Sequence, residues 1–326
     1  MIDLTTTFAG LKLKNPIIIG SSGLTSNAEN NKKLEAAGAG AIVLKSIFEE
    51  QITLQANQMN SNSSYAEGSD GLLDYLRSYS LSQQLELIKD SKKICNIPII
   101  ASINCFSNSE WVDYAHKMEL AGADAIELNI LAVQTAVDYQ YGEFEQRHID
   151  ILRTVKSKIN IPIIMKLGNN LTNPVTLINQ LYANGAAAVV LFNRFYQPNI
   201  DIEKMKYSSN EVFSNPSDLS TPLRWVAICS ATVNKIDYAA SGGVYDGAAV
   251  VKSILAGASA VEICSTIYQN GKGWTSTILD VLEKWMNKKG YEHISQFKGL
   301  MNAKDSKGIN MFERTQFLKY FGEKEE

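Results

Sequence analysis

The sequence contains few cysteines and no cysteine pair. Its 326 residues include only four cysteines, and no Cys-x-x-Cys motif occurs among them. This spacing excludes a disulfide scaffold and a cysteine-rich zinc site. It also excludes an Fe–S cluster. The cysteines are Cys95, Cys105, Cys229 and Cys264.

Long apolar runs, a basic leader and a strong charge excess are also missing. The longest uninterrupted apolar run, residues 186–192, is too short to span a bilayer. The N-terminus lacks the basic start and apolar stretch of a signal peptide. A net charge of −3 gives no indication of nucleic-acid or anionic-membrane binding. We therefore expect a cytoplasmic protein that binds a small molecule, with no nucleic-acid or membrane partner.

Histidine is scarce as well. The three histidines, His116, His148 and His293, fall in predicted helices or in the C-terminal tail. None follows a predicted strand, and we expect neither a catalytic nor a metal-binding role for them.

Eight short, mostly apolar segments alternate with segments of helical length. Continuous apolar runs of this kind are typical of strands that are buried on both faces. Several helical segments end in Gly-Ala directly before the next strand, which suits a left-handed helix C-cap. The alternation predicts an α/β fold, a (β/α)₈ TIM barrel in a single domain over residues 1–326. The expected strands are 15–20, 41–45, 98–103, 124–129, 162–166, 187–192, 235–239 and 259–263.

Several segments fall outside this repeat. Residues 1–14 alternate apolar and polar side chains around Ala9-Gly10 and predict an N-terminal β-hairpin. Residues 290–326 form a C-terminal extension. Long βα loops on the active-site face are expected at 47–80, 130–142 and 194–218, with a helix from 81 to 93 after the first of them.

Two turns near the C-terminus are candidates for phosphate binding. Ser241-Gly242-Gly243 and Cys264-Ser265-Thr266 follow the last two predicted strands. Glycine amides can approach an anion closely, and adjacent turns late in a TIM barrel commonly converge on one phosphate. An ordinary tight turn is the alternative for the double glycine. Gly20-Ser21-Ser22-Gly23 lacks the third glycine and the downstream acid of a dinucleotide loop.

Four polar side chains end other predicted strands. Lys45 and Lys166 each follow four apolar residues, where an unpaired ammonium is costly. Asn129 and Asn193 can donate and accept hydrogen bonds at once, which suits the edge of a planar ligand. The alternatives are lysines that extend into solvent and asparagines that only form turns.

These residues together resemble the class 1 dihydroorotate dehydrogenases. The resemblance covers nearly the whole chain, from Asn15-Pro16 through Asn129 and Met165-Lys166 to Ser241-Gly242-Gly243. It implies FMN as the cofactor, with its phosphate at Gly242, Gly243 and Ser265, and Lys166 near the flavin N1 edge. Lys45, Asn129 and Asn193 are the catalytic and substrate-binding residues that it implies. The FMN-binding residues that it implies are Ser21, Ser22, Gly23, Lys45, Ser46, Asn129, Lys166, Ser241, Gly242, Gly243, Cys264 and Ser265.

The substrate half departs from the family pattern. Family members carry Asn-x-Ser-Cys-Pro-Asn after the fourth strand, and the cysteine there is the catalytic base. This chain has Ala132 at the base position and Gln134 at the second asparagine. Cys105, Asp138 and Tyr139 are replacement candidates by their place in the loops. Arg194, where the family has a small residue, suits the binding of a carboxylate or phosphate.

The sequence therefore favours an FMN-dependent oxidoreductase that transfers a hydride between flavin N5 and a small planar or carboxylated substrate. Three alternatives remain open: a true dihydroorotate dehydrogenase of pyrimidine biosynthesis, a catalytically degenerate flavin-binding protein, and a flavin-free phosphate-binding lyase or isomerase. Family members are often dimers, so a homodimer is the expected assembly. The sequence does not specify the substrate, the base or the electron acceptor.

Overall fold

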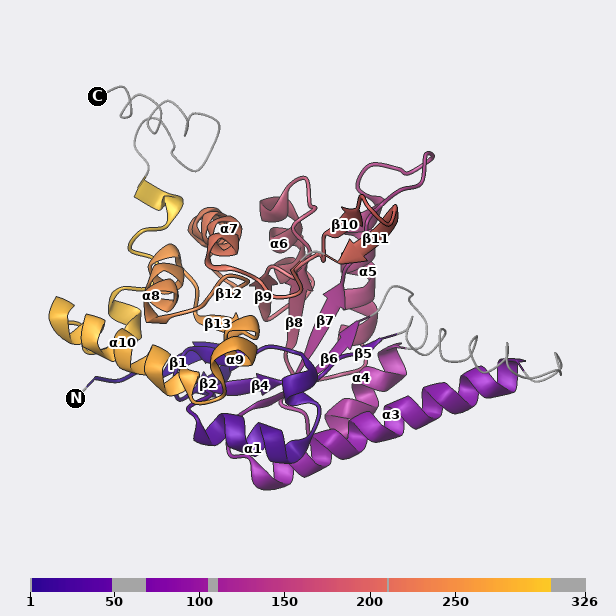
Figure 1. The fold of residues 1–326 in the computed structure, drawn as a ribbon, viewed down its shortest axis with the longest axis horizontal. Coiled ribbons are helices and arrows are strands. Elements are labelled where there is room, and N and C mark those ends of the chain that lie inside the picture. Colours follow the sequence, from indigo (N-terminus) through magenta and orange to yellow (C-terminus); the bar gives the residue numbers. More distant parts are fainter. Residues whose placement is uncertain (1, 49–68, 105–110, 210, 306–326) are drawn as a thin grey trace.

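The fold is a closed barrel of eight parallel strands surrounded by helices (Figure 1). The computed structural model describes residues 2–48, 69–104, 111–209 and 211–305. The barrel closes because β13 pairs with β3 and β4 pairs with β6, which confirms the predicted TIM barrel. Its strands are β3 (Ile17–Ile19), β4 (Ala41–Val43), β6 (Ile99–Asn104), β7 (Ala125–Ile130), β8 (Ile163–Leu167), β9 (Ala188–Leu191), β12 (Asp237–Ser241) and β13 (Ala260–Ile263).

Helices follow the strands and cover the outside of the barrel. Glycines end several of them, as predicted. Gly257 ends α8 with φ of 117°, and a Cβ there would lie 2.2 Å from Ser230 Oγ, so only glycine fits. The helices are α1 (Ala28–Ala36), α3 (Ser69–Ile94), α4 (Trp111–Leu120), α5 (Glu143–Lys156), α6 (Pro174–Ala183), α7 (Ser220–Thr232), α8 (Gly247–Ala256), α9 (Ser265–Asn270) and α10 (Trp274–Lys289). None in the described ranges is long and apolar enough to cross a membrane.

Small apolar side chains fill the barrel interior toward the amino ends of the strands. Ala41, Ala125, Ala188, Ala239 and Ala260 are fully buried there in one cluster with larger aliphatic residues. Because side chains alternate along a strand, the residues two positions further on point into the interior at the carboxyl ends of the strands. The alanine layer therefore supports a second layer at the barrel mouth.

The N-terminal hairpin closes the opposite end of the barrel. Strands β1 (Thr6–Phe8) and β2 (Leu11–Leu13) pair antiparallel as expected. Phe8 and Leu13 are buried and belong to the same cluster as the interior alanines. The Ala9 amide donates to Asp237 Oδ2 at 3.0 Å, which ties the hairpin to the start of β12.

Two of the expected long loops contain regular structure. Helix α3 begins at Ser69, so the expected helix start at residue 81 was wrong. The earlier turns are stabilised by packing, since Leu76, Leu81 and Ile88 are buried in the core. A two-residue strand, β5 (Ile47–Phe48), pairs with β6 at the start of the same segment.

The third loop carries a β-hairpin, and the C-terminal extension packs on the barrel. Strands β10 (Pro198–Asp201) and β11 (Lys206–Ser209) pair antiparallel within residues 194–218, where the sequence predicted only a loop. A 3₁₀ turn, η3 (Pro216–Leu219), follows them. The extension contains η4 (Ile294–Gln296) and η5 (Ala303–Asp305), and its Phe297 is fully buried.

Replacing Phe8 tests whether the hairpin is part of the core. We expect Phe8→Ala to lower the free energy of unfolding by about 3–5 kcal/mol, because a fully buried aromatic side chain leaves a cavity. Urea denaturation measures the change. Lys12→Ala on the exposed side of the same hairpin is the control and should stay within about 0.5 kcal/mol of the parent. Equal stability of both variants would show that the hairpin is not part of the core.

Candidate active site

Polar side chains cluster where the barrel strands end. Asn104, Asn129 and Lys166 are aligned neighbours on β6, β7 and β8. Glu127 on β7 and Glu262 on β13 lie one layer below the mouth, each two residues after an interior alanine. The apolar interior thus ends in a polar layer, as expected for the catalytic end of this fold.

A chain of hydrogen bonds crosses this layer. The Ser21 and Ser46 hydroxyls lie 2.9 Å apart, and Ser46 Oγ lies 2.7 Å from Ser102 Oγ. Asn129 Nδ2 donates to Ser102 Oγ at 3.1 Å, and Asn193 Nδ2 donates to Asn129 Oδ1 at 3.2 Å. The chain joins residues within β6 and β7 to residues that directly follow β3, β4 and β9. Hydrogen bonding on several sides restrains these side chains and so preorganises the site.

Lys166 lies between two carboxylates. Its ammonium is 2.5 Å from Glu262 Oε2 and 3.5 Å from Glu127 Oε1. All three residues are buried, with exposed fractions of 8%, 3% and 0%. Gly20 borders the group, since a Cβ there would lie 3.4 Å from Glu262 Oε2, an ordinary contact distance. The anionic partners that the sequence required for Lys166 are therefore supplied by the protein itself.

The electrostatics of this triad are strongly perturbed. Burial alone would lower the pKa of Lys166, but the charges of Glu127 and Glu262 outweigh it and raise the pKa above the usual value. Burial, and then the neighbouring Glu262 carboxylate, raise the pKa of Glu127 well above its usual range. Glu127 Oε2 and Glu262 Oε1 are buried without a hydrogen-bond partner in the described residues. Such perturbation is common at functional sites.

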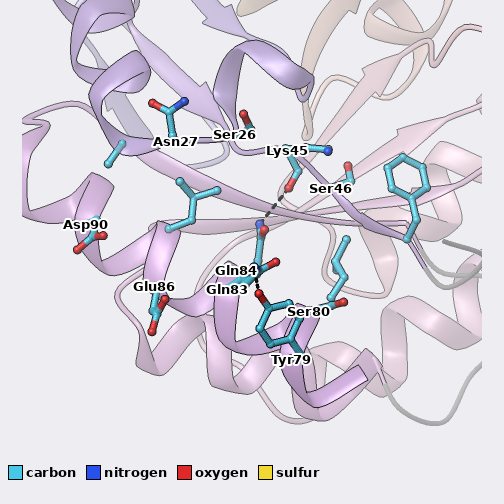
Figure 2. A pocket seen from close by; sticks show the side chains of 14 residues that line it. Ser26, Asn27, Lys45, Ser46, Tyr79, Ser80, Gln83, Gln84, Glu86 and Asp90 are labelled. Atoms are coloured by element: carbon cyan, nitrogen blue, oxygen red, sulfur yellow. Dashed lines mark hydrogen bonds between the residues drawn. The ribbon is translucent and has the colours of Figure 1, made fainter. Parts of the chain in front are cut away.

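The surroundings of Lys45 differ from those of Lys166. Its side chain is exposed, and no ion pair to it exists in the described residues. Its carbonyl accepts from Gln84 Nε2 at 3.0 Å, which fixes the strand end against α3. Figure 2 shows this contact in a cavity of about 490 Å³ between the strand end and α3. The Lys45 ammonium points away from Gln84 in this view.

The two candidate phosphate turns are neighbours. Gly242 and Gly243 have φ of 98° and 70°, in the left-handed region that favours glycine. Gly243 is buried, and a Cβ there would lie 2.2 Å from the Leu219 amide nitrogen. A glycine turn of this kind can present backbone amides to an anion. The start of α8 is capped by Asp246, whose Oδ1 accepts from the Ala249 amide at 2.8 Å.

The second turn, Cys264-Ser265-Thr266, is contacted by residues 213–214. Ser265 Oγ accepts from the Ser214 amide at 3.0 Å, and the Tyr245 hydroxyl donates to the Ser214 carbonyl. Phe213, one residue earlier, packs on Tyr268 with ring centroids 5.4 Å apart. A Cβ at Gly23 would lie 2.8 Å from the Tyr268 hydroxyl. Residues 213–214 and the start of η1 (Gly23–Thr25) thus border one region around Ser265.

Three further predicted residues complete this border. Cys264 is hydrogen-bonded to Ser22, and burial raises the pKa of its thiol, which favours the neutral form. Ser22 Oγ also accepts from the Leu24 amide at 3.3 Å and caps η1. Ser241 is half-buried and pairs in register with Glu262.

A cavity connects the phosphate turn to the asparagine layer. It has a volume of about 250 Å³, and Ser241, Gly242, Asn193 and Asn169 are among the residues that line it. Gly242, predicted for phosphate binding, and Asn193, predicted for substrate binding, thus line one cavity.

The segment after β7, where the substrate is predicted to bind, is more apolar than the corresponding family motif. Ala132 is half-buried, and its carbonyl accepts from Asn170 Nδ2 at 2.9 Å. A Cβ at Gly168 would lie 2.9 Å from Leu131 Cδ1 and 3.3 Å from the Phe195 ring, so these side chains converge beside Gly168. The backbone position of Ala132 is therefore well fixed, although its side chain has no group that accepts a proton.

The candidate replacement bases have different surroundings. The Tyr139 hydroxyl accepts from the Phe144 amide at 3.1 Å, at the beginning of α5. Asp138 is exposed, and Cys105 lies outside the described residues. Gln134, at the family's second asparagine, has a buried Nε2 with no acceptor in the described part of the chain.

Arg194 contacts protein groups. Its Nη1 and Nη2 donate to the carbonyls of Val212 and Glu211 at 2.6 and 3.1 Å, and its Nε lies 3.6 Å from Asp218 Oδ2. These contacts hold residues 211–218 over the barrel mouth. The proposed anion-binding role of Arg194 would require these donors to be released.

The histidines lie away from this layer. His148 is buried in α5, with Nδ1 2.7 Å from the Phe144 carbonyl. His116 is 3.4 Å from Glu119, and His293 is 3.4 Å from Asp3.

Sequence analysis missed three residues of the site, namely Glu127, Glu262 and Ser102. A signal was available for Glu127, which lies two residues before Asn129 and therefore faces the same side of its strand. Ser102 has the same relation to Asn104. Glu262 lies in the middle of a short apolar strand, where an acid is unusual unless it is paired.

Comparison with known proteins shows similarity over nearly the full length. Residues 3–286 match the sequence model of the family described as dihydroorotate dehydrogenase. The chain is 29% identical over 313 residues to a Thermoplasma volcanium protein named "Dihydroorotate dehydrogenase B (NAD(+)), catalytic subunit", covering 92% of this chain and 99% of that protein. A Methanosarcina mazei protein with the same name is 32% identical over 311 residues, covering 91% and 95%.

Removing the lysine tests the energetics of the triad. Lys166→Met leaves two buried carboxylates without a counterion, and we expect a loss of about 3–5 kcal/mol in the free energy of unfolding near neutral pH. The carboxylates then have raised pKa values in the folded state, so the native state binds the extra protons. Stability should therefore fall as pH rises, and the loss should be smaller at about pH 5 than at about pH 8.

Urea denaturation at both pH values measures this effect. Lys45→Met is the matched control, because it removes an exposed ammonium that has no ion pair in the described residues, and it should change stability by less than about 0.5 kcal/mol. A pH-independent loss in Lys166→Met would show that the carboxylates are not the cause.

Proposed function

The chain belongs to the dihydroorotate dehydrogenase family, and we propose on this basis that it is an FMN-dependent oxidoreductase acting on a CH–CH bond of a small, planar, anionic substrate. Family membership makes it an oxidoreductase. The cofactor and the substrate class are inferred from its own residues. The observation that carries the proposal is the glycine turn after β12, whose Gly242 lines one cavity with Ser241 and Asn193.

The phosphate end of FMN fits the two neighbouring turns. The Gly242 and Gly243 amides and the Ser265 side of the second turn would hold it. No lysine or arginine ion pair is needed there, because backbone donors in a turn bind anions well. Ser241 and Cys264 border the same region from β12 and β13.

The ring end of FMN fits the polar layer. Ser22, Gly23 and Ser46 would border the ring, and Lys166 would lie at its edge. When bound, FMN supplies the hydride acceptor or donor at its N5 atom. The protein contributes orientation, since Ser46 and Asn129 are already fixed by the hydrogen-bond chain through Ser102.

Three amides and one cation are available for a substrate. The Asn193 amide reaches the mouth from β9, while Asn129 reaches it from β7. The unpartnered Gln134 Nε2 offers a third amide. Lys45 adds an exposed positive charge. Amides that donate and accept, together with one cation, suit a planar ring with amide-like edges and a negative charge.

The second candidate is oxidation of dihydroorotate itself, which the names of the relatives specify for those proteins. Ala132 is the observation against it, because a substrate C–H proton needs an acceptor and this side chain has none. General acid–base catalysis typically contributes about 10²–10⁴-fold. The catalytically degenerate alternative remains for the case in which no substrate reduces or oxidises the bound flavin.

The relatives' names also describe a catalytic subunit. We extend this to the present chain and propose that a separate subunit exchanges electrons with its flavin. The described residues contain no group of side chains that could hold a metal ion, and the four cysteines lack cluster spacing. Homodimer formation remains a prediction.

FMN binding is the direct test of the cofactor. Purified protein should take up FMN and show a flavin spectrum. Gly243→Ala should weaken FMN binding at least about tenfold, because the new Cβ would overlap Leu219 and displace the turn. Gly290→Ala is the control, since Gly290 has a similar φ of 75° with nothing within 4 Å. A colourless protein that is stabilised by a phosphorylated metabolite and not by FMN would support the lyase or isomerase alternative.

Restoring a base tests the substrate. We expect Ala132→Cys to raise the rate of dihydroorotate oxidation by about 10²–10⁴-fold from a low starting value, measured by anaerobic flavin reduction. Ala132→Val controls for the change in size and should give no gain. Rapid turnover of dihydroorotate by the parent protein would show that another residue already acts as the base.

A further inference from the structure

Lys166 is surrounded by more negative charge than it can neutralise. One ammonium faces two carboxylates, Glu262 at 2.5 Å and Glu127 at 3.5 Å. All three groups are buried. An excess charge in such a place is costly, and buried ionisable groups respond by taking up or releasing a proton. A neutral triad requires one proton on the two carboxylates.

The geometry points to Glu127 as the holder of this proton. Glu262 Oε2 makes the short contact with the ammonium, which is typical of a charged pair. Glu127 Oε1 is farther from Lys166, at 3.5 Å, and accepts a long hydrogen bond of 3.4 Å from Asn129 Nδ2. The raised pKa of Glu127 agrees with this distribution. Glu127 is therefore the neutral acid and Glu262 the counterion.

The two carboxylates can exchange these roles. If Glu262 loses its charge, Glu127 loses the repulsion that keeps it protonated and lies close enough to Lys166 to replace Glu262 as the counterion. The other neighbours do not alter this balance, since Asn129 and Gly20 are uncharged and burial keeps the Cys264 thiol neutral. Either carboxylate alone is thus sufficient to neutralise the lysine.

We propose that Glu127 and Glu262 share one negative charge that neutralises Lys166, and that this sets the reduction potential of the bound flavin below the value that an unpaired lysine would give. The inference rests on the FMN site proposed above. A positive charge at the flavin edge stabilises the anionic reduced form, and a neutralised lysine does so less. The reduced flavin is consequently a stronger electron donor. Glu127 and Glu262 are positioning residues, because they act through Lys166.

The reduction potential of the FMN-loaded protein tests this directly. The titration compares the parent, Glu127→Gln, Glu262→Gln and the double variant at about pH 6, where Lys166 keeps its proton. Each single variant should change the equilibrium constant for reduction by less than about threefold. The double variant should favour reduction by at least about tenfold, an upward shift of about 30 mV for a two-electron couple. The effect is non-additive because one carboxylate replaces the other.

Two results would overturn the proposal. A full shift in Glu262→Gln alone would show that Glu127 does not take over the charge. An unchanged potential in the double variant would show that the carboxylates do not influence the flavin.

Infrared spectroscopy of the protein without cofactor separates the charge sharing from FMN binding. The parent should show the C=O band of one protonated buried carboxyl group at neutral pH. The band should disappear in both single variants, since the remaining carboxylate is then ionised in each. A band that persists in Glu262→Gln contradicts charge sharing even if the double variant does not fold. If the infrared result holds but the protein binds no FMN, the flavin function fails while the charge sharing stands.

Discussion

The ammonium of Lys166 joins two walls of the barrel. Glu127 belongs to β7 and Glu262 to β13, and these strands are four places apart in either direction around the closed sheet. The lysine therefore crosses the barrel interior just above the alanine layer. Such an ion pair brings little net stability, because desolvation offsets attraction. The ion pair instead fixes the position and the charge of the side chains directly below a ligand at the barrel mouth.

Two lysines with the same sequence pattern have opposite environments. Lys45 and Lys166 each end an apolar strand, yet one is exposed and the other buried with two acids. Nothing in the local sequence distinguishes them, because the difference comes from the residues across the barrel. Strand β13 supplies Glu262 to Lys166, and no described residue supplies a carboxylate to Lys45. Buried acids in strands are thus the sequence feature that identifies which lysine is paired.

The barrel could be predicted from the sequence, because strands buried on both faces and glycines at helix C-caps leave local sequence patterns. The sequence predicted all eight strands and the N-terminal hairpin. It was insufficient for the start of α3, whose early turns depend on buried contacts of Leu76 and Leu81, and for the β10–β11 hairpin. At the site, strand-end residues such as Asn129 and Lys166 could be named from their spacing. The sequence also marks Ser102 and Glu262 by their positions in the strands, but their partners, Asn129 and Lys166, are defined only when distant strands meet. The roles assigned to the individual site residues remain predictions.

The N-terminal hairpin limits the access of water to the barrel interior. Phe8 and Leu13 close the lower end of the barrel, and the alanine layer above them is fully buried. Among the described residues, the hairpin thus closes the approach to Glu127 and Glu262 from the amino ends of the strands, which leaves the side of Lys166 and the barrel mouth. A flat ring bound over that lysine at the proposed flavin site would therefore slow the exchange of the shared proton with water.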